Sequence, residues 1–236
     1  MFLPLYDINP IRHLTRPYVN YGLIAATVLV FFLTGGIDPP AVEQSAVSLG
    51  LIPSVVNDIH DLPPDAVLVP TAATYVTYAF LHANLLHLGG NMLFLWVFGD
   101  NVEDAVGHGR YLAFYLLSAI SGGWVHTLVN PDSAVPLIGA SGAVAGIVAA
   151  YFLLHPRVKL WVLVLGRIPV KLSAGWVLGA WAGFQVVNVF LAVPGEDNIA
   201  WWAHIGGLVS GGALILVMRR RGVTLFDKAL PEPPAA

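Results

Sequence analysis

The sequence predicts an all-α membrane protein with six transmembrane helices and both termini on the cytoplasmic side. Of its residues, 57% are hydrophobic and only 11% are charged, whereas an ordinary soluble domain carries about 25% charged residues. Apolar stretches also recur along the chain at lengths close to the roughly 20 residues that cross a hydrocarbon core of about 30 Å. We therefore take the lipid bilayer as the solvent of most of this chain.

The apolar stretches define the expected helices in order. They cover residues 18–35, 84–100, 111–130, 141–155, 174–192 and 201–219. Residues 1–17 form an N-terminal arm, 18–219 the six-helix domain, and 220–236 a C-terminal tail that ends in the disordered segment ALPEPPAA. The connection 36–80 is long and rich in proline, so we expect it to have structure of its own. The semi-apolar stretch LWVLVLGRIPV, which follows the fourth helix, is too short and too charged to cross and is expected at the membrane interface.

The charges segregate between the connections. All eleven basic residues lie in the arm, the second connection, the fourth connection and the tail: Arg12, Arg16; Arg110; Arg157, Lys159, Arg167, Lys171; and Arg219, Arg220, Arg221, Lys228. The other three connections carry only acids: Asp38, Glu43, Asp58, Asp61, Asp65; Asp132; and Glu196, Asp197. Because basic residues stay cytoplasmic, this pattern predicts cytoplasmic termini and supports the span count independently of hydropathy.

The fourth predicted helix is too short to cross the membrane. Its apolar residues 142–154 reach only about 20 Å, against a core of about 30 Å. With its inner end anchored by His155, Pro156 and Arg157, Ser141 lies roughly 10 Å below the outer surface. The preceding PLIGAS segment is then irregular backbone at membrane depth, which is tolerated only against protein or a water-filled cavity. The sequence therefore predicts a wet pocket beside a serine.

Ser141 also has neighbours that suit catalysis. Gly139 and Gly142 bracket it and permit a tight turn, and a helix that begins here directs free N–H groups toward the pocket, as an oxyanion requires. The segment GASGAVAG is equally a small-residue packing face. Small-xxx-small pairs occur in both the fourth and the sixth helices, namely Gly142 with Gly146 and Gly207 with Gly211.

Packing through these glycines would bring His204 of the sixth helix within reach of Ser141, the geometry that general-base activation of a hydroxyl requires. A lone intramembrane histidine is more often structural than catalytic, but His204 shares the depth of Ser141. No Asp or Glu lies in a predicted span at that level. We therefore predict a Ser141–His204 dyad without a third, acidic member.

His87 and Asn91 are four residues apart and share one face of the second helix. Both side chains could donate to developing negative charge, although hydrogen bonding between helices is an equally good interpretation for an intramembrane asparagine. His82, near the membrane surface, is predicted to be structural.

Three motifs together, HANLLHLGGN, GASGAVAG and AHIGGLVSG, resemble those of the rhomboid family of intramembrane serine proteases. The resemblance covers about residues 69–218 and implies a six-helix bundle with a water-filled cavity open to the outside, gated by the fifth helix and its external loop. It implies that Ser141 is the nucleophile and His204 the general base. It further implies that His87, Asn91 and the backbone at Ala140 bind the oxyanion and that His82 is structural.

The function implied by the resemblance is cleavage of transmembrane segments of single-pass membrane proteins through an acyl-enzyme. The partners would be transmembrane protein substrates and the lipid bilayer, with no cofactor, no metal and no nucleic acid. The expected location is a bacterial plasma membrane, crossed several times, with the active site open to the external side.

Two positions depart from the family pattern. Many members carry a Trp-Arg pair in the first external loop, but this chain has neither residue type between Arg16 and Trp96. Some members have a tyrosine four residues after the serine, where this chain has Ala145. What orients His204 is therefore left open, with Trp201 and Trp202 nearby in sequence.

Other functions are weaker alternatives. The strongest is a catalytically inactive rhomboid-like protein that binds membrane clients, although both Ser141 and His204 are retained. A transporter would need paired broken helices, a metalloprotease would need HExxH, and an aspartyl intramembrane protease would need two intramembrane aspartates. Only Asp100 lies near a span, and the chain has no cysteine for a disulfide or a thiolate zinc site.

Overall fold

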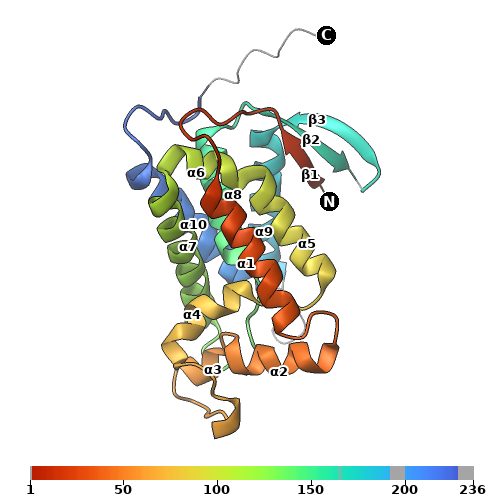
Figure 1. Cartoon of the computed structure of the whole chain (residues 1–236), viewed down its shortest axis with the longest axis vertical. Helices are drawn as coiled ribbons and strands as arrows, with labels where there is room; N and C mark the ends of the chain where they lie inside the picture. The colour runs from red at the N-terminus through yellow and green to blue at the C-terminus, as the bar shows by residue number, and fades with distance from the viewer. Residues whose placement is uncertain (1, 165, 192–199, 228–236) are drawn as a thin grey trace.

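The computed structural model describes residues 2–164, 166–191 and 200–227 as an elongated helical bundle with a small sheet beside one end (Figure 1). Each predicted span contains a helix: α1 (Tyr18–Leu33), α5 (Leu85–Phe94), α7 (His108–Val129), α8 (Ser141–Leu154), α9 (Ala174–Leu191) and α10 (Trp201–Met218). The second helix continues beyond α5 through a π-helical turn, η4 (Leu95–Gly99), into α6 (Asp100–Val106). The tail segment ALPEPPAA and the acidic pair Glu196 and Asp197 lie outside the described residues.

Length and composition allow three of the described helices, α7, α9 and α10, to cross a membrane unaided, while α1 and α8 are shorter apolar helices. The chain is thus mostly helical and membrane-integral in character. The count of six spans and the cytoplasmic termini stay predictions.

Helix α8 forms the centre of the bundle. Ten of its fourteen residues are buried, so protein rather than lipid surrounds it, as its short apolar stretch requires. Two glycines of α10 allow the close approach: a Cβ added at Gly207 would overlap the Gly142 carbonyl, and one added at Gly211 would overlap the backbone of Gly146. The small residues therefore bring the backbones of α8 and α10 into direct contact.

The connection 36–80 is structured, as its length predicts. It contains α2 (Pro39–Leu49), α3 (Pro53–Val56), α4 (Thr74–Thr77) and the 3-10 turns η1 (Pro64–Ala66), η2 (Thr71–Ala73) and η3 (Tyr78–Phe80). Figure 1 shows α2 and α3 at the end of the bundle away from the sheet.

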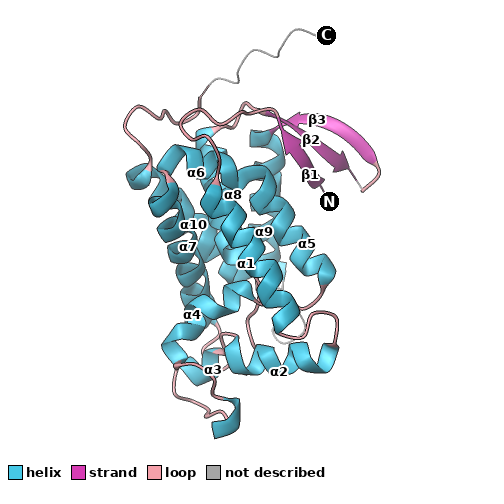
Figure 2. Cartoon of the chain, viewed as in Figure 1, coloured by secondary structure: helices cyan, strands magenta, loops and turns pink. Residues whose placement is uncertain are grey.

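A three-stranded antiparallel sheet departs from the all-α expectation (Figure 2). Strands β2 (Lys159–Val164) and β3 (Ile168–Ser173) form a hairpin in the stretch predicted to be interfacial, and β1 (Phe2–Asp7) of the N-terminal arm pairs with β2. Leu160 and Val162 alternate along β2 and are fully buried. This period of two, with β-branched residues, favours a strand over a helix.

Buried carboxylates of α6 hold the N-terminal arm. Asp104 accepts hydrogen bonds from the backbone N–H groups of residues 12–14 at 2.9, 2.7 and 2.7 Å. Glu103 accepts from the N–H groups of Val19 and Asn20 at 3.1 and 2.7 Å. Since the first N–H groups of a helix lack partners within it, Glu103 acts as the cap that α1 has no residue of its own to provide.

Candidate active site

Ser141 and His204 meet where α8 and α10 begin. Ser141 is the first residue of α8 and His204 lies in the first turn of α10. His204 Nε2 and Ser141 Oγ are 2.8 Å apart, within the reach that proton transfer needs. Ser141 is partly exposed, whereas His204 is 9% exposed and enclosed by protein.

Gln185 of α9 contacts His204 on the side away from Ser141, where a catalytic triad has its third residue. The sequence alone does not predict this contact. The Oε1 atom of Gln185 lies 2.8 Å from His204 Nδ1, and the Gln185 side chain is buried, at 3% exposure. The same amide donates from Nε2 to the carbonyl of Trp181 at 3.2 Å, which orients the oxygen toward the imidazole. Oxygen only accepts here, so Nδ1 carries the proton and Nε2 is free to accept the proton of the serine hydroxyl.

Two tryptophans complete the surroundings of His204. The Trp201 ring lies edge-on to the imidazole, with centroids 5.9 Å apart and an interplanar angle of 90°. The Trp181 ring lies at 6.3 Å and 34°. Both indoles lie near the imidazole in a site where Ala145 offers no ring.

The irregular backbone before Ser141 is anchored by the connection 36–80. Leu137 and Leu51 exchange backbone hydrogen bonds of 2.8 and 3.1 Å, and the Gly139 N–H donates to the carbonyl of Tyr78 at 2.9 Å. Protein groups thus take up the backbone hydrogen bonds of Leu137 and the N–H of Gly139 in this non-helical segment.

Gly139 creates the space for His87. Its φ is +120°, and an added Cβ would lie 2.7 Å from Nε2 of His87. A side chain at this position would be strained by the backbone conformation and would also displace the imidazole. The glycine thus allows the His87 ring to pack against the turn that leads into Ser141.

Asn91 and the Ala140 N–H, the other predicted oxyanion-binding groups, already form hydrogen bonds within the protein. Asn91 donates one Nδ2–H to the His87 carbonyl at 3.0 Å, which leaves its second amide hydrogen available. The Ala140 N–H points at His82 Nε2, at 3.4 Å, and the His82 and His87 rings meet edge to face at 4.9 Å. His82 therefore touches the turn before the serine, and an oxyanion at Ala140 would have to replace this long hydrogen bond.

No group of three or more His, Cys, Asp or Glu side chains that could hold a metal occurs within the described ranges. The chemistry available at this position is that of a hydroxyl, an imidazole and neutral hydrogen-bond donors. Such a set suits nucleophilic attack on a carbonyl followed by stabilisation of an oxyanion.

Comparisons with known proteins find relatives of this chain. The family model described as a rhomboid domain matches residues 70–221. Similar proteins include mitochondrial Rhomboid protein 1 of Saccharomyces cerevisiae (30% identical over 150 residues, 61% of this chain and 41% of that protein). They also include Rhomboid protease GluP of Bacillus subtilis (33% over 136 residues; 58% and 24%) and Rhomboid protease GlpG of Klebsiella pneumoniae (30% over 156 residues; 66% and 51%).

The aligned region is about half or less of the length of these relatives. They come from mitochondria as well as from bacteria, and a further relative is the chloroplastic Rhomboid-like protein 11 of Arabidopsis thaliana, so the comparisons support a membrane location without selecting the bacterial plasma membrane. With the family model covering more than half of its residues, this chain belongs to the rhomboid family.

Proposed function

We propose that this chain is an intramembrane serine endopeptidase that cleaves transmembrane segments of single-pass membrane proteins. The observation that carries the proposal is the hydrogen bond between Ser141 Oγ and His204 Nε2 at 2.8 Å. The contact of Gln185 with the opposite ring nitrogen selects the tautomer that this bond needs. Proteases among the relatives support the same reaction class.

In the proposed reaction, Ser141 Oγ attacks the scissile carbonyl carbon while His204 Nε2 takes the hydroxyl proton. The imidazolium that forms keeps its Nδ1–H on the Gln185 oxygen. A neutral amide replaces the carboxylate of the usual triad and contributes orientation and a dipole rather than a full charge. The tetrahedral oxyanion is held by the backbone N–H groups at Ala140 and Ser141, the second amide hydrogen of Asn91 and the His87 imidazole.

Collapse of the intermediate breaks the C–N bond, and His204 returns its proton to the leaving amine. Water then enters, loses a proton to His204 and attacks the acyl-enzyme carbonyl. A second collapse releases the carboxylic acid and restores the Ser141 hydroxyl. The proposal extends to a site open to the external side of the membrane, because Ser141 lies at the end of α8 opposite the predicted cytoplasmic residues.

The test is cleavage of a helix-destabilised transmembrane substrate by the purified full chain in detergent. Ser141→Ala and His204→Ala are each expected to abolish cleavage without lowering the melting temperature. Ser210→Ala is the matched control, because its hydroxyl only contacts the Gly207 carbonyl on its own helix. Full activity in either dyad variant would refute the mechanism. Substrate capture without turnover by the unmodified chain would favour the inactive client-binding alternative.

A further inference from the structure

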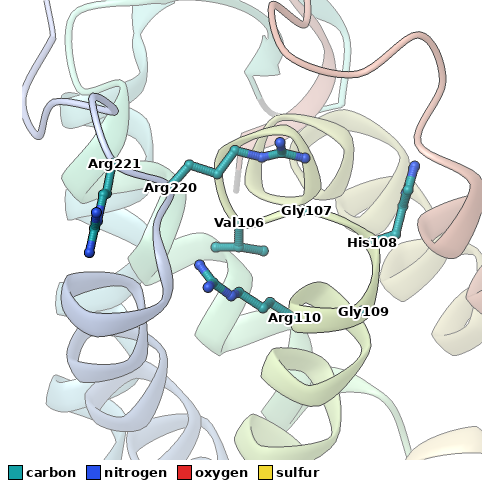
Figure 3. Close-up of a pocket in the computed structure, with 7 residues that line it drawn as sticks. All are labelled: Val106, Gly107, His108, Gly109, Arg110, Arg220 and Arg221. Carbon is teal, nitrogen blue, oxygen red and sulfur yellow. The ribbon is translucent and has the colours of Figure 1, made fainter.

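A second candidate site lies at the other end of the bundle, on the side of the sheet and of the C-terminal end of α10. It is an open cavity of about 650 Å³ between the α6–α7 turn and the chain that follows α10 (Figure 3). Its lining includes three arginines, Arg110, Arg220 and Arg221, and no acidic residue. The volume falls within the range of about 300–1,000 Å³ of ligand pockets.

The backbone brings Arg220 to this cavity. Its N–H donates to the Ala105 carbonyl at 2.8 Å, and its side chain reaches across Gly107, as Figure 3 shows. A Cβ added at Gly107 would lie 2.9 Å from the guanidinium, and Gly107 has a φ of +90°. The glycine therefore leaves the space that the Arg220 guanidinium fills.

The guanidinium has unused donors. The Nε atom of Arg220 is buried without a hydrogen-bond partner among the described residues, and a buried unsatisfied donor is costly. Arg110 reaches back from α7 and donates to the Met218 carbonyl at 3.3 Å, through only one of the five N–H groups of a guanidinium. The three arginines thus place positive charge around a cavity whose lining contains no carboxylate.

The N-terminus of α7 adds backbone donors to the same cavity. This helix of 22 residues starts at His108 after Gly107 and has no side-chain cap. Its first N–H groups lack carbonyl partners within the helix, and the helix dipole places partial positive charge there. The nearby Glu103 is committed to the backbone of α1 and to the His108 ring.

We propose that this cavity binds a phosphate group, supplied in the membrane by the headgroup of an anionic phospholipid. Arginines and helix N-termini are the protein groups that bind phosphate best. Basic pockets at the cytoplasmic ends of transmembrane helices bind anionic headgroups, and this end of the bundle is the one predicted to be cytoplasmic. Leu216 and Val217, just before the arginines on α10, are 50% and 78% exposed and offer an apolar surface for the acyl chains.

The test measures binding and is independent of the Ser141–His204 chemistry. The full chain in an uncharged detergent is titrated with phosphatidylglycerol, with phosphatidylcholine, or with inorganic phosphate against chloride at equal ionic strength. Native mass spectrometry counts the bound lipid, and thermal unfolding measures how far each ligand raises the melting temperature. Phosphatidylglycerol is expected to bind and raise the melting temperature more than phosphatidylcholine. Arg220→Gln is expected to weaken this binding about tenfold, the loss of one charge-assisted contact.

Arg219→Gln is the matched control. It removes the same charge from the same segment, but its guanidinium donates to the carbonyls of Val223 and Leu216 and does not line the cavity. Lipid binding should change less than twofold in this variant. If Arg220→Gln does not fold, the exposed Arg221 is replaced by glutamine instead.

Each outcome decides the proposal. Protection by phosphatidylglycerol alone identifies the lipid headgroup as the source of the phosphate, and equal protection by inorganic phosphate identifies a soluble anion. The phosphate site is overturned if neither ligand gives an effect that depends on Arg220 or Arg221. It is also overturned if Arg219→Gln weakens binding as much as Arg220→Gln.

Discussion

Replacing Gln185 by leucine should slow catalysis without unfolding the protein. The change removes the 2.8 Å contact with His204 Nδ1 and leaves a buried N–H without an acceptor. Such a loss costs about 1–3 kcal/mol, which corresponds to a decrease of about 5- to 150-fold in kcat at roughly 1.4 kcal/mol per factor of ten. The second contact of the amide is with the Trp181 carbonyl one turn earlier on the same helix, so little folding energy depends on it.

The assay is steady-state cleavage of the transmembrane substrate, with kcat and KM determined separately. The Gln185→Leu variant should keep its KM and lose kcat, because the orientation of the base is affected, and its melting temperature should fall by no more than the loss of one buried hydrogen bond explains. Gln185→Glu keeps an oxygen acceptor for Nδ1–H and should recover most of the rate. A residue that only packed the core would instead lower the melting temperature and would not be rescued in this way.

Asn188 provides the matched control on the same helix. Its amide also bonds the carbonyl four residues earlier, that of Phe184 at 2.7 Å, but this hydrogen bond is exposed and no contact with His204 accompanies it. Asn188→Leu should leave kcat unchanged. Undiminished kcat in Gln185→Leu, or an equal loss in Asn188→Leu, would refute the orienting role.

Three further predictions concern packing, pH and the oxyanion. Gly211→Ala should destabilise the protein by about 1–3 kcal/mol, because its Cβ would overlap α8, whereas Gly212→Ala, whose Cβ would meet its nearest neighbour at 3.9 Å, should be neutral or stabilising by thermal unfolding. Burial raises the pKa of the Asp7 carboxyl from 3.8 to about 6. The folded state therefore keeps the proton on Asp7 to a higher pH than the unfolded state does. As pH rises from about 4 to about 6, the free energy of unfolding falls by at most about 3 kcal/mol. Asp7→Asn should reduce this slope in thermal melts recorded against pH, and an unchanged slope would contradict the burial argument. Asn91→Ala should lower kcat by up to about 3 kcal/mol of transition-state stabilisation with KM retained, and a change confined to KM would exclude the oxyanion role.

The positions of the helices could be predicted because hydropathy alone encodes them. The predicted range 141–155 and α8, which spans Ser141–Leu154, differ by one residue. The short length of that helix also indicated irregular backbone before Ser141, since the bilayer thickness sets a fixed requirement. The same argument from length predicts a shared depth for Ser141 and His204, and their side chains are 2.8 Å apart.

Gln185 could not be found in this way. It and Asn188 are both amides in an apolar stretch, and both bond the carbonyl one turn earlier. Hydropathy does not distinguish them, because only the rotation of α9 against α10 decides which amide faces the histidine. A polar residue within a span indicates function, but here Gln185 and Asn188 both meet that description.

The sheet was missed for a different reason. Strand β1 pairs with β2, whose residues lie more than 150 positions later. Local propensity carries no information about such a partner, so the sequence predicts only an arm for residues 2–7. The alternation of Leu160 and Val162 was present in the sequence, but it was too short to be separated from an interfacial apolar segment.

If α9 is the gate that the family resemblance implies, the location of Gln185 on it would couple access to the site with the orientation of His204. Only four of the eighteen residues of α9 are buried, while α8 and α10 are joined backbone to backbone through their glycines. A sideways shift of α9 that opened a path for an incoming helix would also withdraw the amide oxygen from the imidazole. The imidazole would then lose the contact that fixes its tautomer until α9 returned. Hydrolysis would therefore begin only after the substrate helix is enclosed.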